Sequence, residues 1–123
     1  MPRIMVVDDD DDIRAELVEA LKHEGYEVFS AVDARTALQG MRENPPDLLL
    51  TDVIMPHADG WALIRACRAD AQLANVSLLV MSGSPIMRQL AIQSGAAGFL
   101  LKPLSRTATL EAVADVLRNS HPV

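Results

Sequence analysis

Short apolar runs alternate with longer segments of helical period along the chain. Four runs are continuous and apolar, which is typical of strands that are buried on both faces of a sheet. These four runs are Ile4–Val7, Leu48–Leu50, Leu78–Met81 and Phe99–Leu101. A fifth run, Glu27–Val32, is more mixed in polarity and predicts an edge strand. Between the runs, apolar residues such as Leu17, Ala20 and Leu21 share one face of a helix.

Turn and capping residues separate these segments. Gly25 and Gly95 lie where the first and fourth helices are expected to end. Asp33 lies where it can cap the start of the second helix. Asn44–Pro46 stops the second helix, and Asp59–Gly60 predicts a turn before the third. Five βα units without an internal repeat predict an α/β fold, a doubly wound parallel sheet with helices on both faces. Such sheets bind ligands beyond the carboxyl ends of their strands, near the switch in strand order.

Length and composition fit one soluble domain over residues 1–123. Half of the residues are apolar but only 3% are aromatic, so aliphatic side chains must fill the core. The net charge of −6 and a pI near 4.9 argue against direct binding to nucleic acid or to an anionic membrane. The one cysteine, Cys67, cannot form an internal disulfide, and no signal peptide or membrane-spanning run is present. We therefore expect a cytoplasmic protein.

Polar residues follow four of the predicted strands. Asp8 and Asp9 follow the first strand, Asp52 the third, Ser82 the fourth and Lys102 the fifth. Because these strand ends meet at one edge of a parallel sheet, we expect the five side chains to share a crevice. Carboxylates held this close repel one another unless a cation lies between them. Hard oxygen ligands suit Mg²⁺ or Mn²⁺, so the sequence predicts a divalent metal site.

The same residues suit phosphoryl transfer. A carboxylate can attack phosphorus to form an aspartyl phosphate, and Asp52 is the best candidate because it stands alone after its strand. Lys102, Ser82 and the metal would each stabilise the negative charge of the transition state. By contrast, Asp10–Asp12 is interpreted as a solvated turn and helix cap.

Four segments, taken together, resemble the receiver domains of two-component response regulators, including the chemotaxis type. They are Ile4–Asp10, Leu50–Pro56 with Asp59–Gly60, Val80–Gly83, and Gly95–Ala96 leading to Lys102–Pro103. The resemblance covers essentially the whole chain. It implies a flavodoxin-like (βα)5 fold with five parallel strands in the order 2-1-3-4-5.

The resemblance also implies a role for each acidic residue. Asp52 is similar to the phosphoacceptor, which receives a phosphoryl group from a sensor histidine kinase or a histidine phosphotransfer protein. Asp8 and Asp9 are similar to the acidic pair that holds Mg²⁺ together with Asp52. The main-chain carbonyl of Ile54 is implied as a further ligand. No other cofactor is implied.

Further roles follow from the same resemblance. Ser82 matches the hydroxyl that hydrogen-bonds the phosphoryl group, and Lys102 matches the lysine that pairs with it. Phe99 matches the aromatic switch position, whose ring turns inward when the hydroxyl shifts. The Lys102–Pro103 peptide is implied to be cis. Leu104 departs from the Phe that is most frequent in the family, and Phe99 departs from the frequent Tyr because it has no hydroxyl.

A downstream protein or output domain is expected to bind the surface of the fourth helix, fifth strand and fifth helix. On the fourth helix the apolar residues Ile86, Met87, Leu90 and Ala91 share one arc, which predicts the face toward the core. Ile92 falls outside that arc, so we expect it to be exposed and available to a partner.

Three alternatives stay open at this point. A degenerate receiver would serve only as an interaction module. A small phosphatase with an aspartate nucleophile would usually carry a second acid two residues later, where this chain has Ile54. In a flavin- or nucleotide-binding module, Asp8–Asp12 would repel the phosphate of the ligand.

The two ends of the chain leave its extent open. Met1 suggests a natural start, and residues 119–123 are expected to be a tail or the beginning of a linker. A stand-alone regulator and part of a longer protein are therefore both possible.

Overall fold

A computed structural model describes residues 1–55 and 58–119. Its main sheet has five parallel strands in the order β2-β1-β3-β6-β7. The strands are β1 (Arg3–Val7), β2 (Glu27–Ala31), β3 (Leu48–Asp52), β6 (Ser77–Ser82) and β7 (Gly98–Leu101). In chain order these are the second, first, third, fourth and fifth strands of the sheet, which confirms the predicted fold and strand order.

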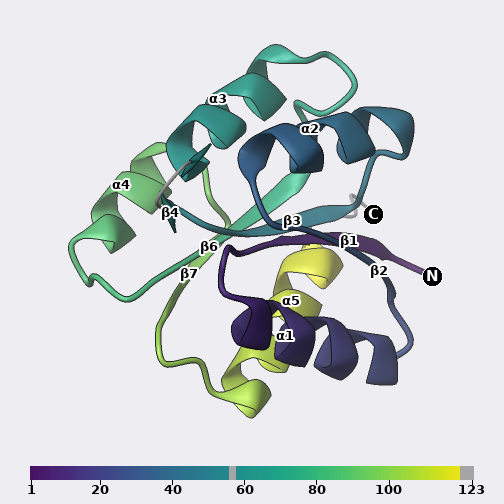
Figure 1. Cartoon of the computed structure of the whole chain (residues 1–123), viewed down its shortest axis with the longest axis vertical. Helices are drawn as coiled ribbons and strands as arrows, with labels where there is room; N and C mark the ends of the chain where they lie inside the picture. Colours follow the sequence, from purple (N-terminus) through teal and green to yellow (C-terminus); the bar gives the residue numbers. More distant parts are fainter. Residues whose placement is uncertain (56–57, 120–123) are drawn as a thin grey trace.

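Helices cover both faces of the sheet. They are α1 (Asp11–His23), α2 (Ala34–Glu43), α3 (Gly60–Ala69), α4 (Met87–Gln93) and α5 (Arg106–Asn119). Figure 1 shows α1 and α5 on one face and α2, α3 and α4 on the other. No helix in the described part of the chain is long and apolar enough to cross a membrane.

Two apolar layers result from the alternation of side chains along each strand. From β1, Ile4 and Val6 join the layer toward α1 and α5, whereas Met5 and Val7 join the layer toward α2, α3 and α4. Aliphatic side chains dominate both layers, as the low aromatic content predicts. The carboxyl ends of the strands lie beyond these two layers and form the polar edge of the sheet.

The predicted boundaries of α1 and α2 agree with the structure. Asp10 caps α1 by accepting hydrogen bonds from the main-chain N–H groups of Asp12 and Ile13. Asp33 caps α2 in the same way, through the N–H of Thr36 at 2.8 Å. Gly25 follows the end of α1 at φ +92°, a conformation that favours glycine.

Two features differ from the prediction. The segment after β3 forms a short antiparallel ladder of β4 (Ile54–Met55) and β5 (Ala58–Asp59), so α3 begins directly at Gly60 instead of after a turn. Two-residue strands leave no periodic pattern in a sequence, which is why this ladder was not predicted. Residues 56–57 and the expected tail from residue 120 lie outside the described residues.

The second difference concerns α4. Ala91 is buried and Met87 is partly buried, but Ile86 is 76% exposed and Leu90 is 44% exposed. The predicted core-facing arc was therefore wrong for Ile86 and Leu90. Ile86 lies before the first helical turn, so helical periodicity does not apply to it. The exposure of Ile92, at 63%, is confirmed.

Candidate functional site

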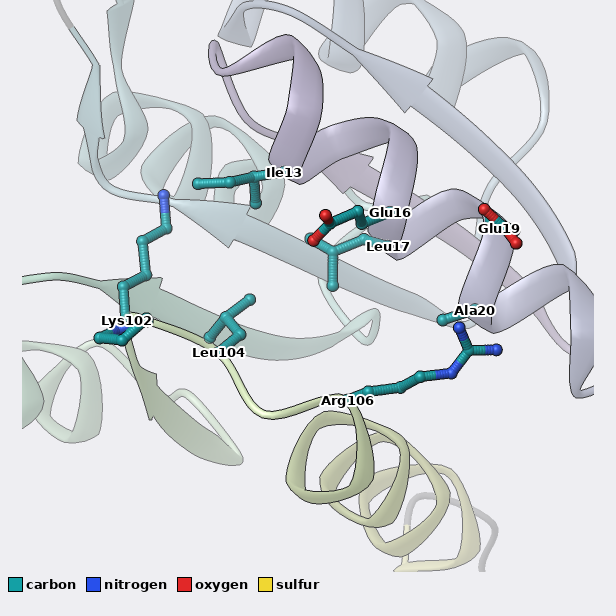
Figure 2. A pocket seen from close by; sticks show the side chains of 9 residues that line it. Ile13, Glu16, Leu17, Glu19, Ala20, Lys102, Leu104 and Arg106 are labelled. Atoms are coloured by element: carbon teal, nitrogen blue, oxygen red, sulfur yellow. The ribbon is translucent and has the colours of Figure 1, made fainter.

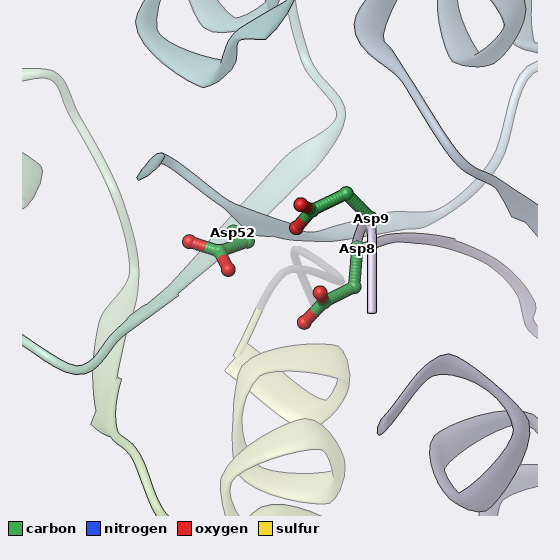
Figure 3. A group of neighbouring side chains, drawn as sticks. All are labelled: Asp8, Asp9 and Asp52. Carbon is green, nitrogen blue, oxygen red and sulfur yellow. The ribbon is translucent and has the colours of Figure 1, made fainter. Parts of the chain in front are cut away.

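Three carboxylates meet at the carboxyl edge of the sheet. Asp8 and Asp9 follow β1 and Asp52 ends β3, and these two strands pair directly up to Val7 and Thr51. One carboxylate oxygen from each of the three aspartates lies within 4.8 Å of the others. Figure 3 shows the three side chains projecting into the same space. Asp8 and Asp52 are buried and Asp9 is exposed, so the cluster opens to solvent on the side of Asp9.

Lys102 brings a positive charge into this cluster. Its Nζ donates a hydrogen bond to Oδ2 of Asp52 at 2.6 Å and another to Oδ2 of Asp8 at 2.8 Å. The residue follows β7, and its main-chain N–H donates to the carbonyl of Ser82 at 2.9 Å. The Lys102–Pro103 peptide is cis, as the resemblance implies. Lys102 therefore links the ends of three strands.

Charge and burial act in opposite directions in this cluster. Burial raises the pKa of Asp8 above its ordinary 3.8, and the hydrogen bonds from Lys102 and from the N–H of Asp10 only partly offset that effect. For Lys102, burial lowers the pKa, but the hydrogen bonds and charges of Asp52 and Asp8 outweigh it and raise the pKa above 10.5. Lys102 is thus firmly cationic, and the cluster keeps an excess of negative charge.

Asp52 is held by its own segment. The N–H of Ile54 donates to Oδ1 of Asp52 at 2.9 Å, while Oδ2 binds Lys102. The hydroxyl of Thr51, which is buried, donates to the main-chain carbonyl of Asp52 at 2.8 Å. The side chain of Ile54 is 54% exposed beside this carboxylate. The carbonyl of Ile54 as a metal ligand stays a prediction.

Ser82 lies on β6, the strand next to β3, and Phe99 lies on β7, the edge strand that follows β6 in the sheet. Ser82 is fully buried at the end of β6, one residue beyond Met81, which pairs with Asp52 in the sheet. The Ser82 hydroxyl oxygen accepts a hydrogen bond from the N–H of Ser84 at 3.1 Å. Phe99, on β7, is partly buried against the layer under α4.

Arg14 supports the site but was missed by the sequence analysis. Its guanidinium donates to the main-chain carbonyl of Asp8 at 2.9 Å and pairs with Asp11 at 2.5 Å. These contacts hold the loop that carries the acidic pair. The spacing of Asp11 and Arg14, three residues apart on a helix, could have predicted their ion pair but not the bond to Asp8.

A groove runs beside the cluster, between α1 and the segment that follows β7. Figure 2 shows Lys102 and Leu104 on one side of it and Ile13 and Leu17 of α1 on the other. The volume of the groove is about 430 Å³. Its lining combines apolar side chains with four charged ones, Glu16, Glu19, Lys102 and Arg106.

The residues of the cluster fit a hard divalent cation. Three carboxylates face one ammonium, which leaves net negative charge in a largely buried place. Oxygen ligands of this kind suit Mg²⁺ or Mn²⁺. Asp9, whose carboxylate is exposed, leaves room for water or a phosphate oxygen as a further ligand.

Several curated relatives of the chain are transcriptional regulators. The transcriptional regulatory protein PrrA of Mycobacterium tuberculosis is 37% identical over 117 residues, which is 95% of this chain and 50% of PrrA. CpxR of Escherichia coli is 36% identical over 121 residues, which is 98% of this chain and 51% of CpxR. The chain thus spans about half the length of these relatives.

Solved structures and a family match agree with these relatives. The chemotaxis response regulator CheY4 of Vibrio cholerae superposes with a TM-score of 0.86 at 31% identity. That alignment covers 94% of this chain and 98% of CheY4, so the whole neighbour corresponds to this fold. Residues 4–114 match the response regulator receiver domain. On these findings, the chain belongs to the family of response regulator receiver domains.

Proposed function

We propose that Asp52 accepts a phosphoryl group from a phosphohistidine of a sensor histidine kinase or a histidine phosphotransfer protein. The observation that carries this proposal is the contact of Lys102 with both Asp52 and Asp8, at 2.6 and 2.8 Å, beside the carboxylate of Asp9. A nucleophilic carboxylate, a cation and an acidic pair thus lie together. These are the groups that phosphoryl transfer to an aspartate needs.

In the proposed step, a carboxylate oxygen of Asp52 attacks phosphorus. The new O–P bond forms while the P–N bond to the donor imidazole breaks, and the imidazole keeps the electron pair. Lys102 balances the charge on the phosphoryl oxygens, and the hydroxyl of Ser82 hydrogen-bonds one of them. A Mg²⁺ or Mn²⁺ ion held by Asp8, Asp9 and Asp52 would supply the remaining positive charge.

Receiver domains of response regulators are signalling proteins that interact with histidine kinases and with output domains. For this chain we propose that Ser82 moves toward the phosphoryl group and that Phe99 then turns inward. The change would alter the surface of α4, β7 and α5, where a downstream protein or output domain binds. Four exposed apolar side chains support this choice of surface: Ile86, Leu90, Ile92 and Leu101.

The same proposal covers the role and location of the chain. Residues 1–123 would act as one receiver unit that catalyses only its own phosphorylation and dephosphorylation. The exposed Ile54 stands where a phosphatase would need its second acid, which disfavours turnover of external phosphoesters. The free thiol of Cys67 fits the reducing cytoplasm, where we place the protein.

Acetyl phosphate and Mg²⁺, followed by intact-mass measurement, test the proposal. We expect one labile phosphoryl adduct on the wild type and none on Asp52→Asn, which keeps the side-chain shape but loses the nucleophile. A wild-type protein that gains no adduct while it stays folded would indicate an interaction module instead. Release of inorganic phosphate from a phosphoester such as p-nitrophenyl phosphate would indicate a phosphatase.

A further inference from the structure

Arg88 of α4 covers the switch residue proposed above. The central carbon of its guanidinium lies 5.1 Å from the centroid of the Phe99 ring, within the range of a cation–π contact. Arg88 is otherwise exposed, and in the part of the chain that the structure describes it makes no ion pair. The α4 sequence MRQLAIQ contains no acidic residue that could compete for it. The ring is therefore the partner that holds this guanidinium.

A second arginine in the molecule makes a useful contrast. Arg3 lies 5.8 Å from the ring of Phe29, but its guanidinium also pairs with Glu27 at 3.3 Å. A carboxylate would hold Arg3 in place whether or not the ring were present. Among the described residues, Arg88 has no such carboxylate partner, so its position and that of Phe99 depend on each other.

The ring of Phe99 lies between a charged group and an apolar layer. One face meets Arg88, and other parts of the ring pack against the buried layer under α4 that includes Val80, its neighbour across the sheet. Movement of the ring further inward would take it away from the guanidinium. Arg88 cannot follow, because an unpaired charge is costly to bury in an apolar layer.

We propose that Arg88 is a positioning residue that holds the Phe99 ring at the surface and so opposes the switch. This inference rests on the proposed function, since it concerns the ring movement that phosphorylation drives. A phenylalanine has no hydroxyl with which to anchor its position, whereas the face of its ring still attracts a cation. Because the contact stabilises the outward position of the ring, a larger phosphorylated fraction of the protein is needed to turn the ring inward.

The expected effect is modest and measurable. An exposed cation–π contact changes an equilibrium about two- to fivefold. Loss of the contact should therefore lower the concentration of a phosphoryl analogue at half-transition by about the same factor. Arg88→Gln removes the charge at nearly constant length, and Arg88→Lys keeps a charge without the planar guanidinium.

Fluorine NMR can follow the ring directly, because the chain contains only two phenylalanines. Uniform 4-fluorophenylalanine gives one resonance for Phe29 and one for Phe99, and Phe29→Leu assigns them. Beryllium fluoride with Mg²⁺ serves as the phosphoryl analogue in a titration. Arg118→Gln is the matched control, since Arg118 is an exposed arginine that pairs with Asp115 on α5.

We expect Arg88→Gln to shift the Phe99 resonance before any analogue is added and to lower the titration midpoint about two- to fivefold. Arg88→Lys should fall between Arg88→Gln and the wild type, and Arg118→Gln should match the wild type. Equal midpoints in the wild type and Arg88→Gln, with normal labelling by acetyl phosphate, would overturn the role of Arg88 alone. A wild type that neither labels nor responds to beryllium fluoride would overturn the proposed function and this inference with it.

Discussion

The carboxylate of Asp8 has no exposed surface, yet it lies beside Asp9 and Asp52, and among the described residues Lys102 is the one cation that pairs with it. Burial raises its pKa in the folded protein above the ordinary 3.8. Folding therefore favours the protonated form, and this contribution to stability is present below pH 3.8 and is lost as the pH rises through the folded pKa. At neutral pH and without a metal, the charge of Asp8 opposes folding.

Replacement of Asp8 by Asn should therefore stabilise the metal-free protein. At neutral pH in EDTA we expect the free energy of unfolding to rise by about 1 kcal/mol, because the mutation removes a buried charge that Lys102 compensates only in part. The gain should shrink as the pH falls through the raised pKa, since the wild type then protonates. Urea unfolding over a pH series measures both effects. Asp12→Asn, an exposed position, serves as the control, and a destabilised Asp8→Asn at neutral pH would contradict the prediction.

If Asp52 is phosphorylated as proposed, the side chain of Ile54 should control how long the phosphorylated state lasts. Ile54 is apolar and exposed beside Asp52, so it cannot orient a water molecule for attack on phosphorus. We expect Ile54→Asn to speed loss of the phosphoryl group by about three- to tenfold, because its amide can position that water. Intact mass after removal of acetyl phosphate gives the rates. Ile54→Leu should decay like the wild type, and equal decay of all three proteins would refute the role of this position.

At the scale of helices and strands, the first residue of α3 lies in close contact with the end of β3. A Cβ added to Gly60 would lie 2.5 Å from the main-chain oxygen of Asp52 and 2.6 Å from the Cα of Val53. Both are main-chain atoms, so neither can move aside without moving the backbone of Asp52. The absence of a side chain at Gly60 thus allows α3 to lie this close to the main chain of Asp52.

Gly60→Ala should consequently lower the free energy of unfolding by about 2 kcal/mol and slow labelling of Asp52 by acetyl phosphate. The matched control is Gly83→Ala, where an added Cβ meets nothing within 4 Å. We expect the stability of that control to change by less than about 0.5 kcal/mol. Thermal unfolding and intact mass measure the two effects, and a Gly60→Ala protein as stable as the control would show that the contact is easily relieved.

The orientation of α4 can be tested with two adjacent residues. Ala91 is fully buried and Ile92 is 63% exposed. Ile92→Asp should keep the free energy of unfolding within about 0.5 kcal/mol of the wild type, whereas Ala91→Asp should lose about 3 kcal/mol or more by burying a charge. Chemical unfolding of both variants gives the comparison. A large loss in Ile92→Asp would mean that this side chain packs in the core instead of facing a partner.

For the whole molecule, we expect stability to depend on divalent cations, because negative charge is in excess at one edge of the sheet. Mg²⁺ should raise the melting temperature of the protein, and at ten times its dissociation constant the stabilisation should be about 1.4 kcal/mol. EDTA should reverse the effect. Asp9→Asn removes the one exposed carboxylate of the cluster, so we expect it to lose most of the response while its metal-free stability changes little. A wild type that melts at the same temperature with and without Mg²⁺ would argue against the metal site.

Individual residues show which features of the fold and the site could be predicted from the sequence and which could not. Asp8, Asp9 and Asp52 were expected together because they follow apolar runs whose carboxyl ends lie at one edge of a parallel sheet. The capping role of Asp33 followed from local chemistry alone. The contact of Arg88 with Phe99 could not be predicted, since it depends on how far a seven-residue helix lies from an edge strand.

The sequence by itself determined the order of strands and helices, the two apolar layers and the collection of polar residues at one edge. These properties follow from periodicity, turn chemistry and chain order, which act over short stretches of sequence. Only the tertiary structure decided that Lys102 binds both Asp8 and Asp52, that Gly60 touches the main chain of Asp52, and that Ile86 and Leu90 remain exposed. Such contacts depend on differences of an ångström or two between elements, and the pattern of a sequence does not carry distances of that size.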